Sequence, residues 1–171
     1  MDTKSPLLIR SERALDKDQV RKVNEAAFGR PDEADLIDRL RVEGAVLLSL
    51  VAEVDGEIIG HILFSRMTVE TAQRSVAAVS LAPMAVAPGH QRRRVGSQLV
   101  CRGLAQLRDR GERIVIVLGH KRYYPRFGFS CEKARCLANP FPPEAFMALE
   151  LSEGALTEVY GAVRYPSAFG L

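Results

Sequence analysis

Two segments near the start of the chain carry apolar residues at every third or fourth position. They cover residues 16–28 and 32–43, and a glycine follows each of them. This spacing predicts two amphipathic helices that end at those glycines. Asp16, followed three residues later by Gln19, has the arrangement of a capping box and predicts the start of the first helix.

Most other apolar segments have the patterns of strands. A short apolar run at residues 7–10 precedes the helices, and two β-rich runs flank Asp55-Gly56, a pair that supplies the positive φ angles of a two-residue hairpin turn. A long strand is predicted at residues 76–86, then a helix, then a β-branched strand at residues 114–118 whose lack of polar alternation suits a position covered on both faces. Strand, helix and strand in this order predict a right-handed parallel crossover.

The remainder adds two strands and no second domain. "FGFSCE" (127–132) and "AFMALEL" (145–151) are the predicted strands, and a turn-rich segment separates them. The sequence has no internal repeat or interdomain linker, and 171 residues match the usual size of one domain. We therefore predict a single domain over residues 1–171, of the α/β class, with a mixed β-sheet and helices on both faces.

The composition and the N-terminal residues bear on which partners and which cell compartment to expect. Hydrophobic residues make up 47% of the chain and charged residues 26%, as in ordinary globular proteins. A net charge of +3 is low for a protein that many phosphate contacts hold on nucleic acid. The N-terminal residues lack the apolar core of a signal peptide, and no apolar window approaches the roughly 20 residues that span a bilayer. We expect a cytoplasmic protein without a nucleic-acid or membrane partner.

The cysteines predict neither a disulfide framework nor a metal site. Cys101, Cys131 and Cys136 are odd in number and include no C-x-x-C pair. We expect reduced thiols without a catalytic role, and no metal.

The segment "APGHQRRRVGSQ", residues 87–98, lies between the predicted strand 76–86 and the following helix. The first N–H groups of a helix have no intrahelical partners and lie at the positive end of its dipole, so they bind anions readily. Three consecutive arginines there oppose the dipole unless an anion is bound. Gly96 permits close backbone approach and Ser97 adds a hydroxyl. The turn is a candidate pyrophosphate site, and a solvated basic surface is the alternative.

Pro83 stands inside the predicted strand, although proline cannot donate to a sheet ladder and belongs at an edge, a strand start or a bulge. A bulge would splay this strand from its parallel neighbour at residues 114–118. The peptide groups of residues 84–86 would then be free to pair with an extended, amide-containing ligand. A slot of peptide groups that ends at a phosphate site fits coenzyme A, with its pantetheine arm and pyrophosphate.

These motifs together resemble those of the GNAT N-acetyltransferase family. "MAVAPGHQRRRVGSQLV" is similar to the family's acetyl-CoA signature, a bulged strand followed by Q/R-x-x-G-x-G/A and a helix. "YYPRFGF" is similar to the second motif, and "LAPMAV", "VLGHKRYYPRFGF", "FMALEL" and "VRYPSAFG" resemble the YhbS-like subgroup. The resemblance covers nearly the whole chain. Arg94 stands where the signature has its first glycine. In a helical conformation its Cβ would point away from the amides, although the side chain could still crowd the phosphates.

The resemblance implies an N-acetyltransferase that moves an acetyl group from acetyl-CoA to a primary amine, by direct attack in a ternary complex and without a covalent enzyme intermediate. Tyr124, four residues before Gly128, stands where the family has its candidate acid, and it is expected to protonate or hydrogen-bond the leaving thiolate. A backbone N–H of residues 84–86 is expected to stabilise the oxyanion. The residues predicted to bind the cofactor are Met84, Ala85, Val86, Gln91, Arg92, Arg93, Arg94, Val95, Gly96, Ser97, Gly119 and Tyr124.

The sequence leaves the general base and the acceptor open. The strand before the phosphate turn contains no carboxylate, so His61, His120, Glu57, a water chain and an amine that arrives neutral all stay as candidates. The segments "NPFPPEAF" (139–146) and "VRYPSAFGL" (163–171) are predicted to shape the acceptor pocket, because loops commonly carry specificity. A homodimer is the default expectation for a soluble enzyme.

Two other functions fit parts of the sequence. A protein of the same fold that binds or senses acyl-CoA without turnover would keep the cofactor motif, with Arg94 as a mark of decay. A nucleic-acid binder would use the arginine run, but no aromatic platform is interleaved with it. Thiol release with amines distinguishes the enzyme from the sensor, and steep salt dependence would mark the nucleic-acid binder.

Overall fold

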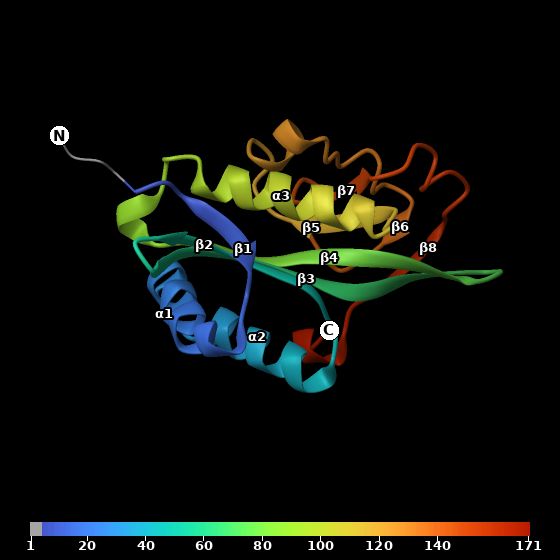
Figure 1. The fold of residues 1–171 in the computed structure, drawn as a ribbon. Coiled ribbons are helices and arrows are strands. Elements are labelled where there is room, and N and C mark those ends of the chain that lie inside the picture. Colours follow the sequence, from blue (N-terminus) through green and yellow to red (C-terminus); the bar gives the residue numbers. More distant parts are fainter. Residues whose placement is uncertain (1–4) are drawn as a thin grey trace.

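A computed structural model describes residues 5–171 as one eight-stranded sheet flanked by helices (Figure 1). The strands follow the order β1-β2-β3-β4-β5-β7, and β8 pairs with both β3 and the short β6. The pairs β4–β5 and β6–β8 are parallel and the other strand pairs are antiparallel. The mixed sheet with helices on both faces, predicted from the sequence, is confirmed.

The α-helices, strands β1 to β5 and strand β7 have bounds close to those that the hydrophobic pattern predicts, whereas β6 and β8 were not predicted. The strands are β1 (Leu8–Ser11), β2 (Val46–Val54), β3 (Glu57–Thr71), β4 (Ser75–Val86), β5 (Ile114–Leu118), β6 (Leu137–Ala138), β7 (Phe146–Glu150) and β8 (Gly161–Arg164). The α-helices are α1 (Lys17–Phe28), α2 (Asp32–Glu43) and α3 (Val95–Asp109). None of the helices formed by residues 5–171 is long and apolar enough to cross a membrane.

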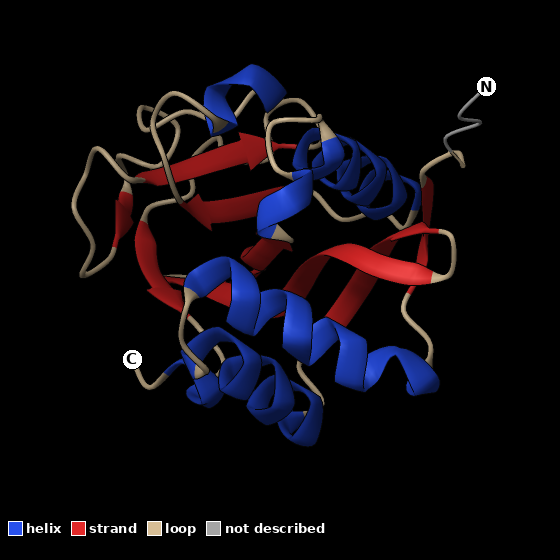
Figure 2. Cartoon of the chain, turned by 90° about the vertical axis from the view of Figure 1, so that its left-hand side faces the viewer, coloured by secondary structure: helices blue, strands red, loops and turns tan. Residues whose placement is uncertain are grey.

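Helices α1 and α2 cover one face of the sheet and α3 covers the other (Figures 1 and 2). Successive residues of β2 face opposite cores, as the two-residue period of a strand requires. Val51 packs in the core beneath α1 and α2, together with Leu63. Leu50 packs in the core beneath α3, together with Phe64 and Leu99. Both cores are fully buried at these positions, so the sheet holds α2 and α3 in fixed places on either side of it.

Strands β4 and β5 separate halfway along β4. Their ladder joins Val79–Leu81 to Val115–Val117, and no further pair follows between them in the described part of the chain. On the other side of β4, Ala82 and Pro83 together lie opposite a single residue of β3, Leu63. A one-residue bulge of this kind bends the strand that carries it. The bulge and the splay that the sequence predicts at Pro83 are confirmed.

The capping box predicted at the start of α1 is wrong. Asp16 has the N-cap position, but its side chain makes no capping bond. Its carboxylate instead accepts hydrogen bonds from the Arg10 guanidinium at 2.7 Å and from the Arg13 N–H at 2.6 Å. The Gln19 side chain accepts a bond from the Ile58 N–H at 3.0 Å, on β3. Asp16 thus binds residues shortly before it and Gln19 binds a residue on a distant strand, so the two side chains do not form the capping box.

The strand predicted at residues 127–132 is also wrong. A 3-10 helix at Tyr124–Phe127 ends at Gly128, whose φ of 98° turns the chain. Within residues 127–132 the sheet pairing is limited to an isolated bridge between Ser130 and Ala148. This turn places two adjacent tyrosines beside the wedge between β4 and β5.

Candidate active site

Two cavities meet at the open end of the β4–β5 wedge. The first, which we call the arginine cavity, has a volume of about 590 Å³ and lies between the bulged end of β4 and the N-terminus of α3, where Arg92 lines it. The second, the aromatic cavity, has a volume of about 520 Å³ and lies between the ends of β4 and β5, the start of α2 and the C-terminal segment, where Phe141 and Tyr165 line it. Met84 and Phe28 line both cavities.

Most of the residues predicted to bind the cofactor surround the arginine cavity. Arg93 is exposed and lies outside its lining, and Gly119 and Tyr124 line the aromatic cavity instead. The predicted residues that line the arginine cavity are Met84, Ala85, Val86, Gln91, Arg92, Arg94, Val95, Gly96 and Ser97. One contiguous stretch of sequence therefore builds one wall of a single cavity.

The end of β4 presents backbone groups to the arginine cavity. The Ala87 N–H donates to β3 at 2.8 Å, which fixes the alternation of the β3–β4 ladder. By that alternation Ala85 directs its N–H and C=O towards β3, whereas Met84 and Val86 direct theirs to the side that β5 has left. The Val86 carbonyl accepts a hydrogen bond from Gln91 Nε2 at 3.0 Å. The N–H groups of Met84 and Val86 face the opening in the sheet, where an extended ligand could pair with them.

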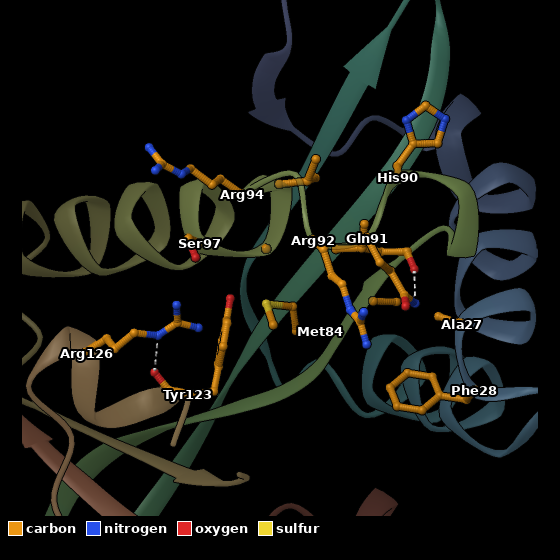
Figure 3. A pocket seen from close by; sticks show the side chains of 14 residues that line it. Ala27, Phe28, Met84, His90, Gln91, Arg92, Arg94, Ser97, Tyr123 and Arg126 are labelled. Carbon is orange, nitrogen blue, oxygen red and sulfur yellow. Dashed lines mark hydrogen bonds between the residues drawn. The ribbon is translucent and has the colours of Figure 1, made fainter. Parts of the chain in front are cut away.

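Arg92 and Arg94 both have left-handed backbone conformations, with φ of 60° and 64°. Arg94 is the N-cap of α3 and is not helical, so the condition under which its Cβ would point away from the amides is not met. The conformation explains why glycine suits this position in the signature, because a residue with a Cβ adopts it at a cost of about 1–2 kcal/mol. Figure 3 shows Arg92 extending towards Phe28 and Arg94 extending back along α3. The Arg94 side chain therefore leaves the centre of the cavity open.

Tyr123 and Arg126 complete the arginine cavity opposite α3, and the sequence analysis missed both (Figure 3). The Arg126 guanidinium lies 4.4 Å from the centre of the Tyr123 ring, and its Nε donates to the Tyr123 carbonyl at 3.2 Å. A methyl group added at Gly96 would lie 2.9 Å from the Tyr123 hydroxyl. The pair adds a phenol and a positive charge to the side facing the helix N-terminus. The available signal was an arginine three residues after a tyrosine in "YYPRF".

Tyr124 lies in the aromatic cavity and packs against Gly119. A methyl group added at Gly119 would lie 2.2 Å from the Tyr124 ring, so this glycine provides the space that the ring occupies. The Gly119 N–H donates to the Ala145 carbonyl at 2.9 Å. Burial, and to a smaller extent the nearby Tyr123, raise the pKa of the Tyr124 hydroxyl above its ordinary value near 10. The hydroxyl is therefore a hydrogen-bond donor throughout the physiological pH range.

Of the three side chains considered as a general base, His120 alone lines one of the two cavities. His120 is exposed at the rim of the aromatic cavity, and its Nδ1 accepts a hydrogen bond from the Arg122 N–H at 3.2 Å. Glu57 is exposed at the β2–β3 hairpin. His61 is fully buried and lines neither cavity.

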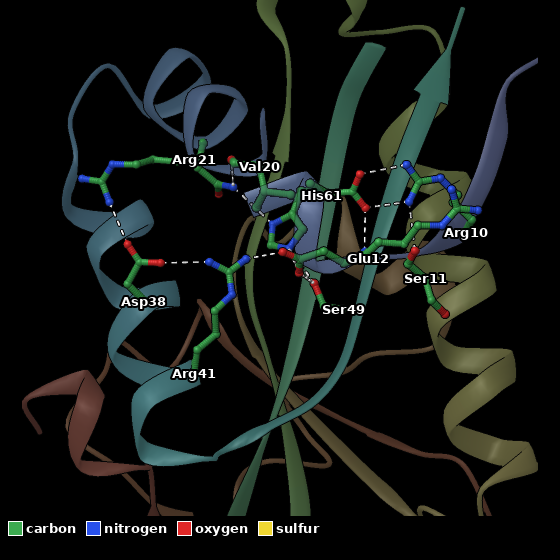
Figure 4. A network of polar contacts seen from close by, with 12 residues as sticks. Arg10, Ser11, Glu12, Val20, Arg21, Asp38, Arg41, Ser49 and His61 are labelled. Carbon is green, nitrogen blue, oxygen red and sulfur yellow. Dashed lines mark hydrogen bonds and ion pairs between the residues drawn. The ribbon is translucent and has the colours of Figure 1, made fainter. Parts of the chain in front are cut away.

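His61 belongs to a buried polar network beneath α1 (Figure 4). Asn24 Nδ2 lies 3.2 Å from His61 Nδ1 and also donates to a backbone carbonyl at 2.9 Å, so Nδ1 is the acceptor and Nε2 carries the proton. Nε2 lies 2.9 Å from the Ser49 hydroxyl, which in turn donates to Glu12, the partner of Arg41. Burial, followed by the nearby Arg41 charge, lowers the pKa of His61 to about 3. This imidazole is neutral and has a structural role.

The two segments predicted to shape the acceptor pocket both reach the aromatic cavity. Phe141 comes from the first segment, and Tyr165, Phe169 and Leu171 come from the second. The second segment is fixed to α2, because the N–H groups of residues 167 and 168 both donate to the Glu43 carboxylate at 2.9 Å. Segments far apart in the sequence thus form one wall.

The geometry agrees with the results of comparisons with known proteins. The family described as "Acetyltransferase (GNAT) domain" matches residues 9–131. The chain therefore belongs to the GNAT acetyltransferase family.

Particular relatives extend this result to the whole chain. The uncharacterized N-acetyltransferase YjhQ of Escherichia coli (strain K12) is 40% identical over 137 residues, which are 78% of this chain and 76% of that protein. The uncharacterized N-acetyltransferase YhbS of the same strain is 33% identical over 166 residues, which are 95% of this chain and 98% of that protein.

Two solved structures have the same fold. The crystal structure of YhbS from Escherichia coli in complex with CoA superposes with a TM-score of 0.91, at 32% identity, and covers 100% of this chain and 96% of its own. A GNAT family acetyltransferase from Brucella melitensis in complex with acetyl-CoA has a TM-score of 0.81, at 35% identity, and covers 96% and 98%. The resemblance predicted from the sequence motifs is confirmed.

Proposed function

We propose that the protein transfers the acetyl group of acetyl-CoA to a primary amine within a ternary complex. The observation that carries this proposal is the meeting of the two cavities at Met84, where the β4–β5 wedge is open. A donor in one cavity and an acceptor in the other would bring their reacting groups together at that point. Holding two reactants in alignment lowers a reaction barrier by several kcal/mol, about 7–11 in the best cases.

The arginine cavity has the groups that coenzyme A requires. The free N–H groups at the start of α3, together with Arg92 and Ser97, suit the pyrophosphate. The outward backbone of Met84 and Val86 suits the amides of a pantetheine arm. Two relatives whose structures contain CoA or acetyl-CoA support the choice of this cosubstrate.

Acetyl-CoA supplies a thioester, whose carbonyl carbon forms a C–N bond with the amine while the C–S bond breaks and the thiolate departs. The N–H of Met84 or Val86 stabilises the oxyanion that develops on the carbonyl. Tyr124 donates a hydrogen bond to the departing sulfur. Its raised pKa makes complete proton transfer to a thiolate unfavourable, so the hydrogen bond is its main contribution.

The ammonium must lose a proton before the amine attacks. Of the three candidate side chains, His120 is the one in a position to accept it. His120 lines the aromatic cavity and is open to solvent, so it or a water molecule beside it takes the proton. The protein supplies no nucleophile in this mechanism. The free thiols of Cys101, Cys131 and Cys136 line neither cavity.

Thermal unfolding with acetyl-CoA, CoA and a short RNA tests the ligand, and thiol release with a panel of amines tests the reaction. The proposal expects a shift with both coenzymes and amine-dependent thiol release. A shift without thiol release from any amine would favour a module that binds acyl-CoA without turnover. A shift with RNA alone, abolished by salt, would instead identify the arginine run as a nucleic-acid site.

A further inference from the structure

The aromatic cavity has the size and the lining of a binding site for a small organic molecule. Its volume, about 520 Å³, lies within the roughly 300–1,000 Å³ typical of small-molecule sites. The ring centres of Phe141 and Tyr165 lie 5.8 Å apart and those of Tyr165 and Phe169 lie 5.0 Å apart. Burial raises the pKa of the Tyr165 phenol, so this wall is uncharged. Aromatic faces of this kind attract cations and pack against apolar groups.

Glu33 is the one acidic side chain among the described residues that line this cavity, and no lysine or arginine is among them. It comes from the first turn of α2, and its side chain is only 15% exposed. The hydrogen bond from Arg30 lowers the pKa of the Glu33 carboxyl, so the group is a carboxylate at neutral pH. Glu33 therefore supplies the one fixed side-chain charge among the described residues of this lining, and that charge is negative.

Arg30 does not close the site to other cations. Arg30 binds both Glu33 oxygens, through Nε at 3.2 and 3.1 Å and also through Nη2, but the arginine side chain is 59% exposed and lies outside the cavity lining. Water and salt reach the exposed guanidinium, which weakens the pair, and the carboxylate oxygens keep further lone pairs that can accept from a second donor. A cation arriving through the cavity could bind the same carboxylate.

We infer that the acceptor is a small amine with an aromatic or bulky apolar body, and that Glu33 determines this specificity by binding its ammonium group. This inference rests on the proposed function, because it assigns the aromatic cavity to the acceptor. The carboxylate complements the charge that a primary amine has in water, and the rings of Phe141, Tyr165 and Phe169 complement its body. An acceptor carrying its own carboxylate next to the amine is disfavoured by repulsion from Glu33.

The alternative role for Glu33 is support of the α2 dipole, which any acidic residue of the first turn provides. Asp32 gives a matched control: it is in the same turn, is 69% exposed and lines neither cavity. Glu33→Gln and Asp32→Asn each remove one negative charge from that turn. Only the first removes a charge from the cavity.

The experiment measures thiol release with 2-phenylethylamine, phenylalanine and putrescine, which separate the ring, the added carboxylate and the bare cation. The wild-type protein should prefer 2-phenylethylamine. Glu33→Gln should raise its KM by roughly tenfold with little change in kcat, and should reduce the discrimination against phenylalanine, whereas Asp32→Asn should change neither. Arg30→Gln, which removes the competing partner, should lower the KM two- to threefold.

Direct binding of 2-phenylethylamine to the protein–CoA complex, measured by calorimetry, separates this inference from the proposed function. Binding that Glu33→Gln weakens, without thiol release, would support the inference and contradict the reaction. Turnover or binding that responds equally to Glu33→Gln and Asp32→Asn would overturn the inference and leave the reaction standing. Absence of 2-phenylethylamine binding, or a wild-type preference for phenylalanine or putrescine, would also overturn it. If Glu33→Gln does not fold, a lower KM in Arg30→Gln would support the inference and an unchanged KM would overturn it.

Discussion

The two cavities differ in how the chain builds them. One wall of the arginine cavity comes from residues 84–97, and its main features are backbone ones: a bulged strand, left-handed residues and the first turn of α3. The aromatic cavity takes side chains from α2, from the loop after β5, and from residues 141 and 165–171. Backbone recognition suits a ligand common to a family, whereas side chains from scattered segments can change independently. The contrast explains why one continuous motif marks the arginine cavity, whereas the motifs that reach the aromatic cavity are separate short segments.

The adjacent residues Tyr123 and Tyr124 offer the sharpest test of this division, because each lines a different cavity. Tyr124→Phe should lower kcat about 100-fold, the usual effect of losing one donor to a transition state, with unchanged CoA binding. Tyr123→Phe should weaken CoA binding a few-fold and leave kcat within a factor of about two. Steady-state kinetics and calorimetry measure both. Full turnover in Tyr124→Phe would remove the hydrogen-bonding role.

A methyl group at Gly96 should damage mainly the arginine cavity. The new Cβ would lie 2.9 Å from the Tyr123 hydroxyl and 3.4 Å from Met84. Gly96→Ala should therefore weaken CoA binding about tenfold, the equivalent of roughly 1.4 kcal/mol, because side chains must move into the cavity. Gly89→Ala is the control, since its Cβ would meet nothing within 4 Å. Equal affinity in the two variants would show that CoA does not pass between Gly96 and Tyr123.

His61 tests whether a third region contributes to either cavity. Its native pKa, about 3, lies below the ordinary value near 6.5, so the unfolded chain binds the proton first as the pH falls. Above pH 6.5 His61 is neutral in both the folded and the unfolded chain and does not affect stability. Below pH 6.5 the free energy of unfolding falls by up to about 1.4 kcal/mol per pH unit, until pH 3.

Urea unfolding between pH 4 and 8 would measure how the free energy of unfolding depends on pH. His61→Gln should lower the number of protons taken up on unfolding by up to one. The variant should keep the pH profile of kcat/KM wherever it stays folded. A changed profile in the folded variant would contradict the structural role of His61.

Arg94 gives the smallest expected effect. Arg94→Gly should raise the free energy of unfolding by about 1 kcal/mol, because glycine adopts the left-handed N-cap conformation without a Cβ clash. It should weaken CoA binding a few-fold through the lost charge, and Arg94→Lys should change neither quantity much. Denaturant unfolding and calorimetry measure the two effects. Tighter CoA binding in Arg94→Gly would show that the arginine crowds the phosphates.

The sequence predicts the scaffold well, because its signals are local. The Asp55-Gly56 turn, the glycines after α1 and α2 and the bulge at Pro83 each report a conformation that neighbouring residues determine. Arg94 shows the limit: its residue type favours a helix, but the turn before α3 imposes a left-handed conformation. Asp16 and Gln19 likewise have the spacing of a cap and yet bind partners on other elements.

The lining of the aromatic cavity was less predictable, because it depends on packing between segments that are far apart in the sequence. The loops containing Phe141 and Tyr165 could be suspected from their aromatic and proline content. Glu33 could not, because it is one of three acidic residues in the first turn of α2 and only the packing of that helix selects it. Arg126 was similarly hidden, since its stacking on Tyr123 depends on the 3-10 turn.

Met84 lines both cavities, and this shared wall couples the choice of one substrate to the choice of the other. Its unbranched thioether bends readily, so space yielded to a longer acyl chain is space withdrawn from the amine. Acyl length and acceptor bulk should consequently trade against each other. An enzyme evolved from this scaffold towards butyryl or larger groups would be expected to accept slimmer amines.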